Sequence, residues 1–316
     1  MTAPRPRLVG RYDEGRPGPL VVALGAVHGN EPAGVLAAER LLRALARERD
    51  AQPGFAFRGR FAAFVGNVGA LAAGRRFLRR DLNRHLDPGR VARLAASAET
   101  GDAPLAAEDA EAVALVAAVR AEVAAHRPPR VVVADLHTTT ADGGAFSIVG
   151  DDPAARRLAL ACHAPVVLGM LAGGLAGTTM HALTAEQLGA PTAGMVFESG
   201  RHDDPAAVTR AASALTLLLA AAGCVDEACV DPGHARRLRE EFAHLPAATE
   251  LAYVHQIAPR DRFAMRPGYV NFAPVAAGEV LADDVRGEVR CPLAGRVLMP
   301  LYQPQGGEGF FVVREA

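Results

Sequence analysis

Hydrophobic and polar positions divide the chain into two parts with different periodicity. Up to about residue 225, short and nearly continuous apolar runs alternate with longer segments of helical periodicity. The runs that we expect to form strands are 20–24, 60–65, 131–135, 145–149, 166–170 and 194–197. The segments that we expect to form helices are 33–49, 107–125, 154–161 and 205–222. Buried strands separated by helices are typical of an α/β fold with a mixed, mostly parallel sheet flanked by helices.

The pattern changes toward the C-terminus. Residues 231–244 have the pattern of one more short amphipathic helix, and from residue 249 short runs rich in Val, Phe and Tyr alternate with Gly- and Pro-containing turns. We therefore expect three parts: an α/β domain over 1–225, a connecting helical segment over 226–244, and a smaller, mainly β domain over 245–316. Residues 85–104 are expected to form a surface excursion.

Composition excludes several classes of partner. The 316 residues carry a net charge of −1, and aromatic residues make up only 5% of them with no Trp, so neither a nucleic acid nor an anionic membrane is expected. The four cysteines have no Cys-x-x-Cys spacing, and a zinc site at Cys224 and Cys229 is a weak alternative to reduced, buried thiols. Since no signal-peptide pattern is present, we expect a cytoplasmic protein. Homo-oligomerisation stays open.

Polar side chains follow four of the predicted strands at the point where each strand ends. His28 and Glu31 follow strand 20–24, and the segment 75–86 comes after strand 60–65. Asp135 ends strand 131–135 with His137 two residues on, and Glu198 follows strand 194–197. The carboxyl ends of parallel strands meet at one edge of a sheet, and ligands bind there in open α/β folds. We therefore expect these five side chains to share a cleft.

Two histidines and one carboxylate form a recurrent catalytic zinc site that leaves a coordination position open. His28, Glu31 and His137 supply this set, and Asp135 is placed to accept the other ring N–H of a ligand histidine. The alternatives are a chance His-x-x-Glu and an ordinary hydrogen-bonded histidine at a strand end.

Glu198 follows an apolar strand, so burial should raise its pKa toward neutrality. Beside a metal, such a carboxylate suits general base and acid chemistry. The alternatives are that it caps the helix starting near Pro205 or pairs with Arg201.

The segment RRFLRRDLNRHL, residues 75–86, follows the predicted strand 60–65 and can reach the same cleft. Asn83 and Arg84 suit a carboxylate, because Arg offers a planar donor fork and Asn an amide N–H. His85, and in other loops His181 and His202, could border the pocket, although a solvated loop histidine is the alternative for each.

GAVHGNEPAG, RRFLRRDLNR, ADLHTTT and VFESG occur in this order. Together they resemble the succinylglutamate desuccinylase/aspartoacylase family, part of the wider zinc carboxypeptidase-like hydrolases. The resemblance covers nearly the whole chain. It implies hydrolysis of an N-acyl amino acid to a carboxylic acid and a free amine.

The resemblance also implies residue roles. His28, Glu31 and His137 match the ligands of a single zinc ion, and Glu198 matches the general base and acid. The remaining matches bind substrate: Asn83 and Arg84 hold its carboxylate, and Arg76 polarises the scissile carbonyl.

Two departures concern specificity. Leu188 stands where aspartoacylases carry an arginine for the substrate's side-chain carboxylate, and Phe310 or Phe311 stands where they carry a tyrosine. Losing the charged partner should disfavour N-acetylaspartate. We therefore expect a small N-acyl amino acid with a neutral or apolar side chain as substrate.

Other functions stay open at this point. A zinc carboxypeptidase or a peptidoglycan-type amidase would use the same chemistry in a wider cleft. A metal- or ligand-binding protein with a degenerate site is the non-enzymatic alternative, although Glu198 and Arg76 speak against it.

Overall fold

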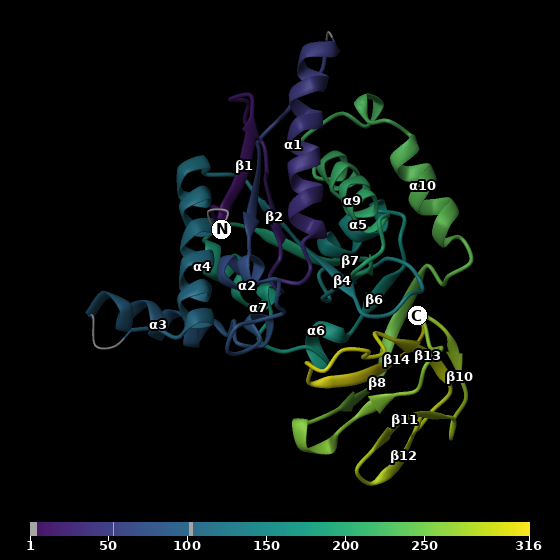
Figure 1. Ribbon diagram of the computed structural model, residues 1–316. Helices are drawn as coiled ribbons and strands as arrows, with labels where there is room; N and C mark the ends of the chain where they lie inside the picture. The colour runs from purple at the N-terminus through teal and green to yellow at the C-terminus, as the bar shows by residue number, and fades with distance from the viewer. Residues whose placement is uncertain (1–4, 53, 101–103) are drawn as a thin grey trace.

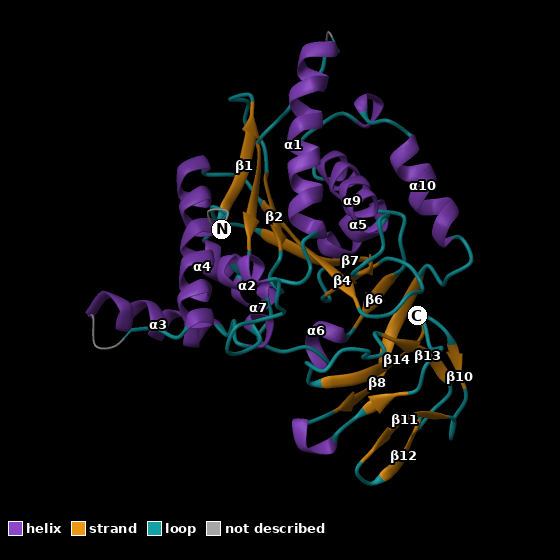
Figure 2. Ribbon diagram, in the orientation of Figure 1, coloured by secondary structure: helices purple, strands orange, loops and turns teal. Residues whose placement is uncertain are grey.

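The computed structural model describes residues 5–52, 54–100 and 104–316. A twisted central sheet has helices on both faces, and a smaller β region lies at one end of it (Figure 1; Figure 2). The larger helices are α1 (Ala33–Ala51), α3 (Pro88–Thr100), α4 (Ala107–His126), α5 (Pro153–Ala161), α9 (Ala207–Ala221) and α10 (Gly233–Phe242). The shorter ones are α2 (Val68–Ala73), α6 (Met170–Gly173), α7 (Thr179–Ala182), α8 (Ala185–Leu188), η1 (Leu82–Arg84), η2 (Glu227–Cys229) and η3 (Pro259–Asp261).

The large sheet has the strand order β1-β3-β2-β4-β7-β5-β6-β8-β14-β13-β10. Its first seven strands are β1 (Leu8–Asp13), β3 (Arg60–Val65), β2 (Leu20–Gly25), β4 (Val131–Thr139), β7 (Thr192–Arg201), β5 (Phe146–Val149) and β6 (Val166–Leu168). Strands β3, β2, β4 and β7 are mutually parallel, whereas β5 runs antiparallel to β7 and β1 antiparallel to β3. The carboxyl ends of the four parallel strands therefore lie at one edge.

Both faces of the parallel strands are buried, which explains their nearly continuous apolar sequences. On one face, Val21 and Val132 pack with α1, α5 and α9 in one hydrophobic cluster. On the other face, Val22 and Val133 pack with α4. Alternate residues of a strand point to opposite faces, so each run of valines contributes to two cores.

The C-terminal strands continue the same sheet. Strand β8 (Ala248–Gln256) pairs parallel with β6 and antiparallel with β14 (Glu308–Glu315). Next to these lie β13 (Gly295–Leu298) and β10 (Pro274–Val275). A second sheet has the order β12-β11-β9, formed by β12 (Gly287–Arg290), β11 (Val280–Asp284) and β9 (Ala264–Met265).

The structure confirms the expected α/β fold with its smaller C-terminal β region. The three-part domain division stays a prediction, and β8 ties the last part to the main sheet through backbone hydrogen bonds. The elements that were not predicted include the short helices, the edge strand β1, and helix α3 within the expected surface excursion 85–104. Only Val91 of α3 is buried, so its weak apolar face gave little signal; residues 101–103 of that excursion lie outside the described residues. None of the described helices combines the length and apolar character needed to cross a membrane.

Candidate active site

The turn between β2 and α1 carries the His-x-x-Glu sequence. His28 and Glu31 are both buried, and His28 Nδ1 lies 3.0 Å from Glu31 Oε1. Helix α1 starts directly afterwards at Ala33, so its first turn holds this segment against the carboxyl edge of the sheet. The two side chains thus face one point, as their spacing predicts.

Strand β4 brings His137 to the same point. Its Nδ1 lies 3.0 Å from the other carboxylate oxygen of Glu31, and the backbone N–H of Thr138 donates to that oxygen at 3.0 Å. The rings of His28 and His137 lie 5.0 Å apart between centroids. One ligand atom from each of His28, Glu31 and His137 falls within 4.8 Å of the others. His28, Glu31 and His137, which were expected to meet beyond the strand ends, therefore lie together.

Each histidine has a second carboxylate on its other ring nitrogen. His137 Nε2 lies 2.9 Å from Asp135 Oδ2, and His28 Nε2 lies 3.0 Å from Asp81 Oδ1. Carboxylates at this position orient ligand imidazoles and raise their basicity. Asp135 was expected in this role; Asp81 was not, although it lies inside the DLNR sequence.

The charges of this group reinforce one another. Burial opposes ionisation of Glu31, but His28 and His137 hold its pKa well below the usual value. Burial likewise opposes the charged form of His137, yet Asp135 and Glu31 hold its pKa well above the usual value. A carboxylate between two imidazoles therefore attracts positive charge strongly. Two imidazole nitrogens and a carboxylate oxygen, each with an ordered partner, fit the donor set of a zinc ion.

Replacing Asp135 by Asn is expected to weaken metal binding by about 10–100-fold, because the His137 imidazole loses its basic partner. Isothermal titration with Zn²⁺ measures this directly. Asp142→Asn is the matched control, since Asp142 is exposed and pairs with Arg201 at the surface. Equal affinities of Asp135→Asn and the wild type would contradict the orienting role.

Strand β7 places Glu198 directly opposite His137 in the register of the β4–β7 pair. Its side chain is buried, and Oε2 has no hydrogen-bond partner among the described residues. Burial raises the pKa of Glu198 to about 8. Neither alternative role is seen: Arg201 pairs with Asp142 and Asp203, and α9 begins at Ala207 without a side-chain cap. A buried carboxylate with a free oxygen beside the cluster is suited to proton transfer.

The segment that follows α2 supplies three donor side chains. Arg76 donates through Nε and Nη2 to Asp81 and through Nη1 to Glu31. Asn83 accepts the backbone N–H of Thr179 on its Oδ1, and its Nδ2 lies 3.5 Å from His137 Nε2. These contacts hold Arg76 and Asn83 against the His/Glu cluster.

Arg84 is bound from the C-terminal part of the chain. Its Nε and Nη2 donate to Glu308 at 3.1 and 2.8 Å, and its Nη1 donates to the carbonyl of Asn83. A guanidinium has five N–H groups, so one on each terminal nitrogen remains for a further acceptor. Gly177 makes this packing possible: its φ is +63°, and a Cβ there would lie 2.5 Å from the Arg84 carbonyl oxygen.

A cavity of about 50 Å³ lies beside the cluster. Arg76, Arg84 and Thr138–Thr140 line it from the α/β part, together with His202. The chain from β13 to β14 closes it with Met299, Leu301, Gln303, Gly306, Glu308 and Phe311. The site is thus a small, mainly polar chamber with an apolar wall.

Comparison with known proteins shows the family of the chain. A family model described as the succinylglutamate desuccinylase/aspartoacylase catalytic domain matches residues 17–221. The chain belongs to this family. Members are deacylases, that is, amidohydrolases. No curated protein matches the chain in a sequence search.

Solved structures share the fold of the chain over most of its length. A succinylglutamate desuccinylase/aspartoacylase from Rhodobacter sphaeroides is 19% identical, with a TM-score of 0.64 over 95% of this chain and 87% of that one. The succinylglutamate desuccinylase of Chromobacterium violaceum is 21% identical, with a TM-score of 0.61 over 96% and 86%. Murine aminoacylase 3 is 17% identical, with a TM-score of 0.60 over 96% and 97%.

Leu188 and Phe310, which we expect to differ from aspartoacylases, lie in hydrophobic clusters. Leu188 is the last residue of α8 and packs in the cluster beneath α4. Phe310 is buried in the C-terminal β region, where it stacks on His255, whereas its neighbour Phe311 lines the cavity. Adjacent residues of β14 point to opposite faces, so only one of the two phenylalanines can face the cavity, and the sequence alone did not decide which.

The three loop histidines have different surroundings. His85 Nδ1 lies 2.8 Å from the carbonyl of Asp81, and His181 Nδ1 lies 2.8 Å from the Thr178 hydroxyl at the start of α7. His202 alone of the three lines the cavity. Burial lowers the pKa of His202, so the imidazole is neutral near pH 7.

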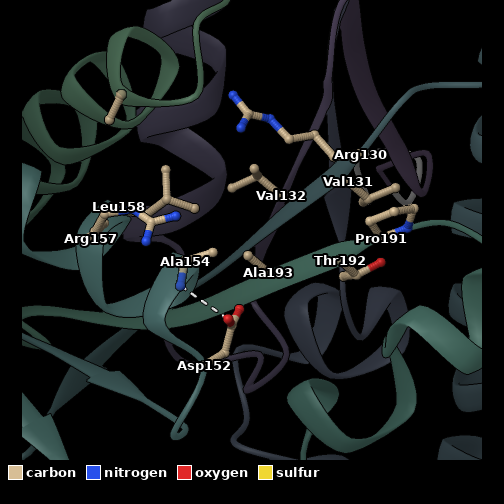
Figure 3. Close-up of a pocket in the computed structure, with 11 residues that line it drawn as sticks. Arg130, Val131, Val132, Asp152, Ala154, Arg157, Leu158, Pro191, Thr192 and Ala193 are labelled. Carbon is tan, nitrogen blue, oxygen red and sulfur yellow. Dashed lines mark hydrogen bonds between the residues drawn. The ribbon is translucent and has the colours of Figure 1, made fainter.

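Figure 3 shows another cavity, of about 420 Å³, at the opposite edge of the sheet where β4 and β7 begin. Its lining includes Arg130, Arg157 and Asp152, and the Asp152 carboxylate accepts the N–H of Ala154 as the N-cap of α5. Within the described residues, none of the predicted site residues lines this cavity. It is larger than the chamber beside the cluster, but it lies away from the candidate metal ligands.

Proposed function

We propose that the protein is a zinc-dependent deacylase that hydrolyses the amide bond of a small N-acyl amino acid other than N-acetylaspartate. The observation that carries the proposal is the buried His28–Glu31–His137 cluster with the unpartnered carboxylate of Glu198 beside it. The few cysteines, all free, fit action in the cytoplasm.

His28, Glu31 and His137 would hold one zinc ion per chain. When bound, zinc supplies Lewis acidity that activates water and polarises a carbonyl oxygen. The chain's own residues then have separate tasks in the hydrolysis.

Glu198 moves the proton. As a carboxylate it takes a proton from the attacking water, whose oxygen bonds to the acyl carbon, and it returns that proton to the amine nitrogen as the C–N bond breaks. The products are a carboxylic acid and a free amine. A pKa near 8 matches a group that must both accept and release a proton.

Arginine side chains bind the substrate. Arg76 has two N–H groups left beyond its bonds to Asp81 and Glu31, and these suit the negative charge that develops on the scissile carbonyl oxygen. The free terminal N–H groups of Arg84, with Asn83, suit the substrate carboxylate. The contacts with Glu308 orient the Arg84 guanidinium for this purpose.

Chamber size supports a small substrate over a peptide or a glycan. The β13–β14 connection forms one wall of this small cavity through Leu301, Gln303 and Gly306. A zinc carboxypeptidase or a peptidoglycan-type amidase would need a wider opening. Retention of Glu198 and Arg76 argues against a binding protein without chemistry.

The test is a screen of N-acyl amino acids with and without a chelator, following release of free amine. We expect neutral N-acyl amino acids to be hydrolysed, activity to disappear with chelator, and zinc to restore it. We also expect N-acetylaspartate to have a kcat/KM at least about tenfold lower, since its second carboxylate meets no unpaired cation. A preference for N-acetylaspartate would contradict the substrate assignment, and chelator-resistant hydrolysis would contradict the zinc requirement.

A further inference from the structure

His202 lies at the end of β7, where the β4–β7 pairing changes register. From His137 to Thr139 the pairing advances by two residues on β4, whereas on β7 it advances by three, from Glu198 to Arg201. Such a bulge re-aims the side chains that follow it. The backbone N–H of His202 then donates to the carbonyl of Thr139 at 3.0 Å, which holds the residue against β4.

The His202 ring spans the space between Thr138 and the cavity. Its Nδ1 lies 2.7 Å from the Thr138 hydroxyl. Its Nε2 is buried and makes no direct hydrogen bond among the described residues, although the Gln303 side chain lies next to the ring, and His202 lines the cavity beside the cluster. A buried ring nitrogen at a cavity wall is a position for a ligand atom, because native proteins rarely leave such groups unpaired.

The hydrogen bond between Thr138 and His202 indicates which ring nitrogen of His202 carries the proton. The Thr138 hydroxyl has no other partner in the part of the chain that the structure describes, so its hydrogen is used only if it donates to Nδ1. The proton of the neutral imidazole then resides on Nε2. His202 therefore presents an N–H donor, which requires an oxygen or another acceptor on the ligand.

The charges around the cavity exclude a carboxylate as that acceptor. Arg76 is paired with Asp81 and Glu31, and Arg84 is paired with Glu308. After the substrate's own carboxylate has used the remaining N–H groups of Arg84, no unpaired cation lines the cavity within the described residues. Met299, Leu301 and Phe311 provide an apolar wall for a short carbon chain.

We propose that His202 determines specificity by donating its Nε2–H to an uncharged oxygen, a hydroxyl or an amide carbonyl, on a short side chain of the substrate's amino-acid portion. This inference rests on the proposed function for the orientation of the substrate.

The test measures binding, so that it does not depend on turnover. Zinc-loaded protein is titrated by calorimetry with pairs of amino-acid products that differ by one oxygen: L-homoserine against L-2-aminobutyrate, and L-serine against L-alanine. Of L-homoserine and L-serine, the one that binds more tightly should have a Kd about tenfold lower than its analogue without the hydroxyl, which is the effect of one hydrogen bond. L-Aspartate should bind more weakly than either hydroxylated ligand.

Three variants separate the donor from general packing. His202→Leu should weaken binding of the hydroxylated ligands only, so the ratio of the Kd of each deoxy analogue to that of its hydroxylated partner should fall to near one. His202→Gln keeps a hydrogen-bond donor and should retain part of this ratio. His244→Leu, at an exposed loop histidine, should leave the ratio unchanged. A wild type that does not discriminate, or a His202→Leu ratio equal to that of the wild type, would overturn the assignment.

Hydrolysis of the corresponding N-acetyl amino acids is followed in parallel. Discrimination in binding without any hydrolysis would contradict the proposed function and still support the role of His202. Hydrolysis without discrimination in binding would support the proposed function and contradict the role of His202.

Discussion

Replacing Glu198 by Gln is expected to reduce kcat for amide hydrolysis by about 10²–10⁴-fold, the contribution of a positioned general base and acid. The amide is nearly isosteric with the carboxylate but takes no proton from water at neutral pH. Zinc binding should persist, because Glu198 is outside the ligand set. Steady-state kinetics together with metal analysis of the purified variant measure both effects.

The same variant has a second expected effect, on the stability of the metal-free protein. Burial raises the pKa of Glu198 from 4.5 to about 8, so the folded state binds the proton more tightly than the unfolded state. Ionisation therefore opposes folding, and the wild type should lose stability as pH rises from about 4.5 to 8. Glu198→Gln lacks this loss and should exceed the wild type at pH 8 by about 4 kcal/mol, with little difference at pH 4.

Urea denaturation of chelator-treated protein at several pH values checks this slope. Glu186→Gln, at an exposed glutamate in the first turn of α8, is the matched control and should follow the wild type. If Glu198→Gln still hydrolysed the amide at the wild-type rate, the proposed mechanism would be wrong. A pH-independent stability difference would show that Glu198 is not the buried acid.

Replacing Glu31 by Gln is expected to affect both metal binding and stability. Glu31 joins the Nδ1 atoms of His28 and His137, accepts the Thr138 N–H and pairs with Arg76. Without its charge, zinc affinity should fall by more than the roughly 10–100-fold that follows loss of an orienting partner. The metal-free protein should lose about 3–5 kcal/mol, because buried cationic groups lose their counter-charge.

Calorimetric zinc titration and urea denaturation measure the two effects separately. Glu186→Gln again serves as the control for a change of charge alone. Unchanged zinc affinity in Glu31→Gln would contradict the ligand set and, with it, the proposed zinc dependence. Normal stability of the metal-free variant would mean that the cluster holds less charge than its contacts indicate.

The position of β1 and the continuity of the sheet show what local patterns leave undecided. Periodicity predicted β2 and β3 closely and the apolar parts of β4 and β7, because these segments are buried on both faces. It missed the polar C-terminal ends of β4 and β7, which carry site residues. It did not predict β1, which has one buried residue and stands at the sheet edge. The joining of β8 to β6 follows from pairing between distant segments, which no local pattern contains.

In the candidate site, too, the sequence predicted some features and left others undecided. The sequence by itself determined that polar residues end several buried strands, and its motifs resemble the family that the chain belongs to. It also contained His28, Glu31 and His137 in a recognisable spacing. Side chains at the ends of parallel strands converge for a topological reason, so their meeting could be predicted.

Only the tertiary structure decided which groups surround that centre. Asp81 orients His28 across 53 positions, and Glu308 binds Arg84 across 224. A single bulge in β7 turns His202 into the cavity, and the alternation of β14 gives Phe311 rather than Phe310 to its wall. Such contacts depend on how loops pack between elements that are distant in the chain, and short-range residue patterns carry no information about that packing.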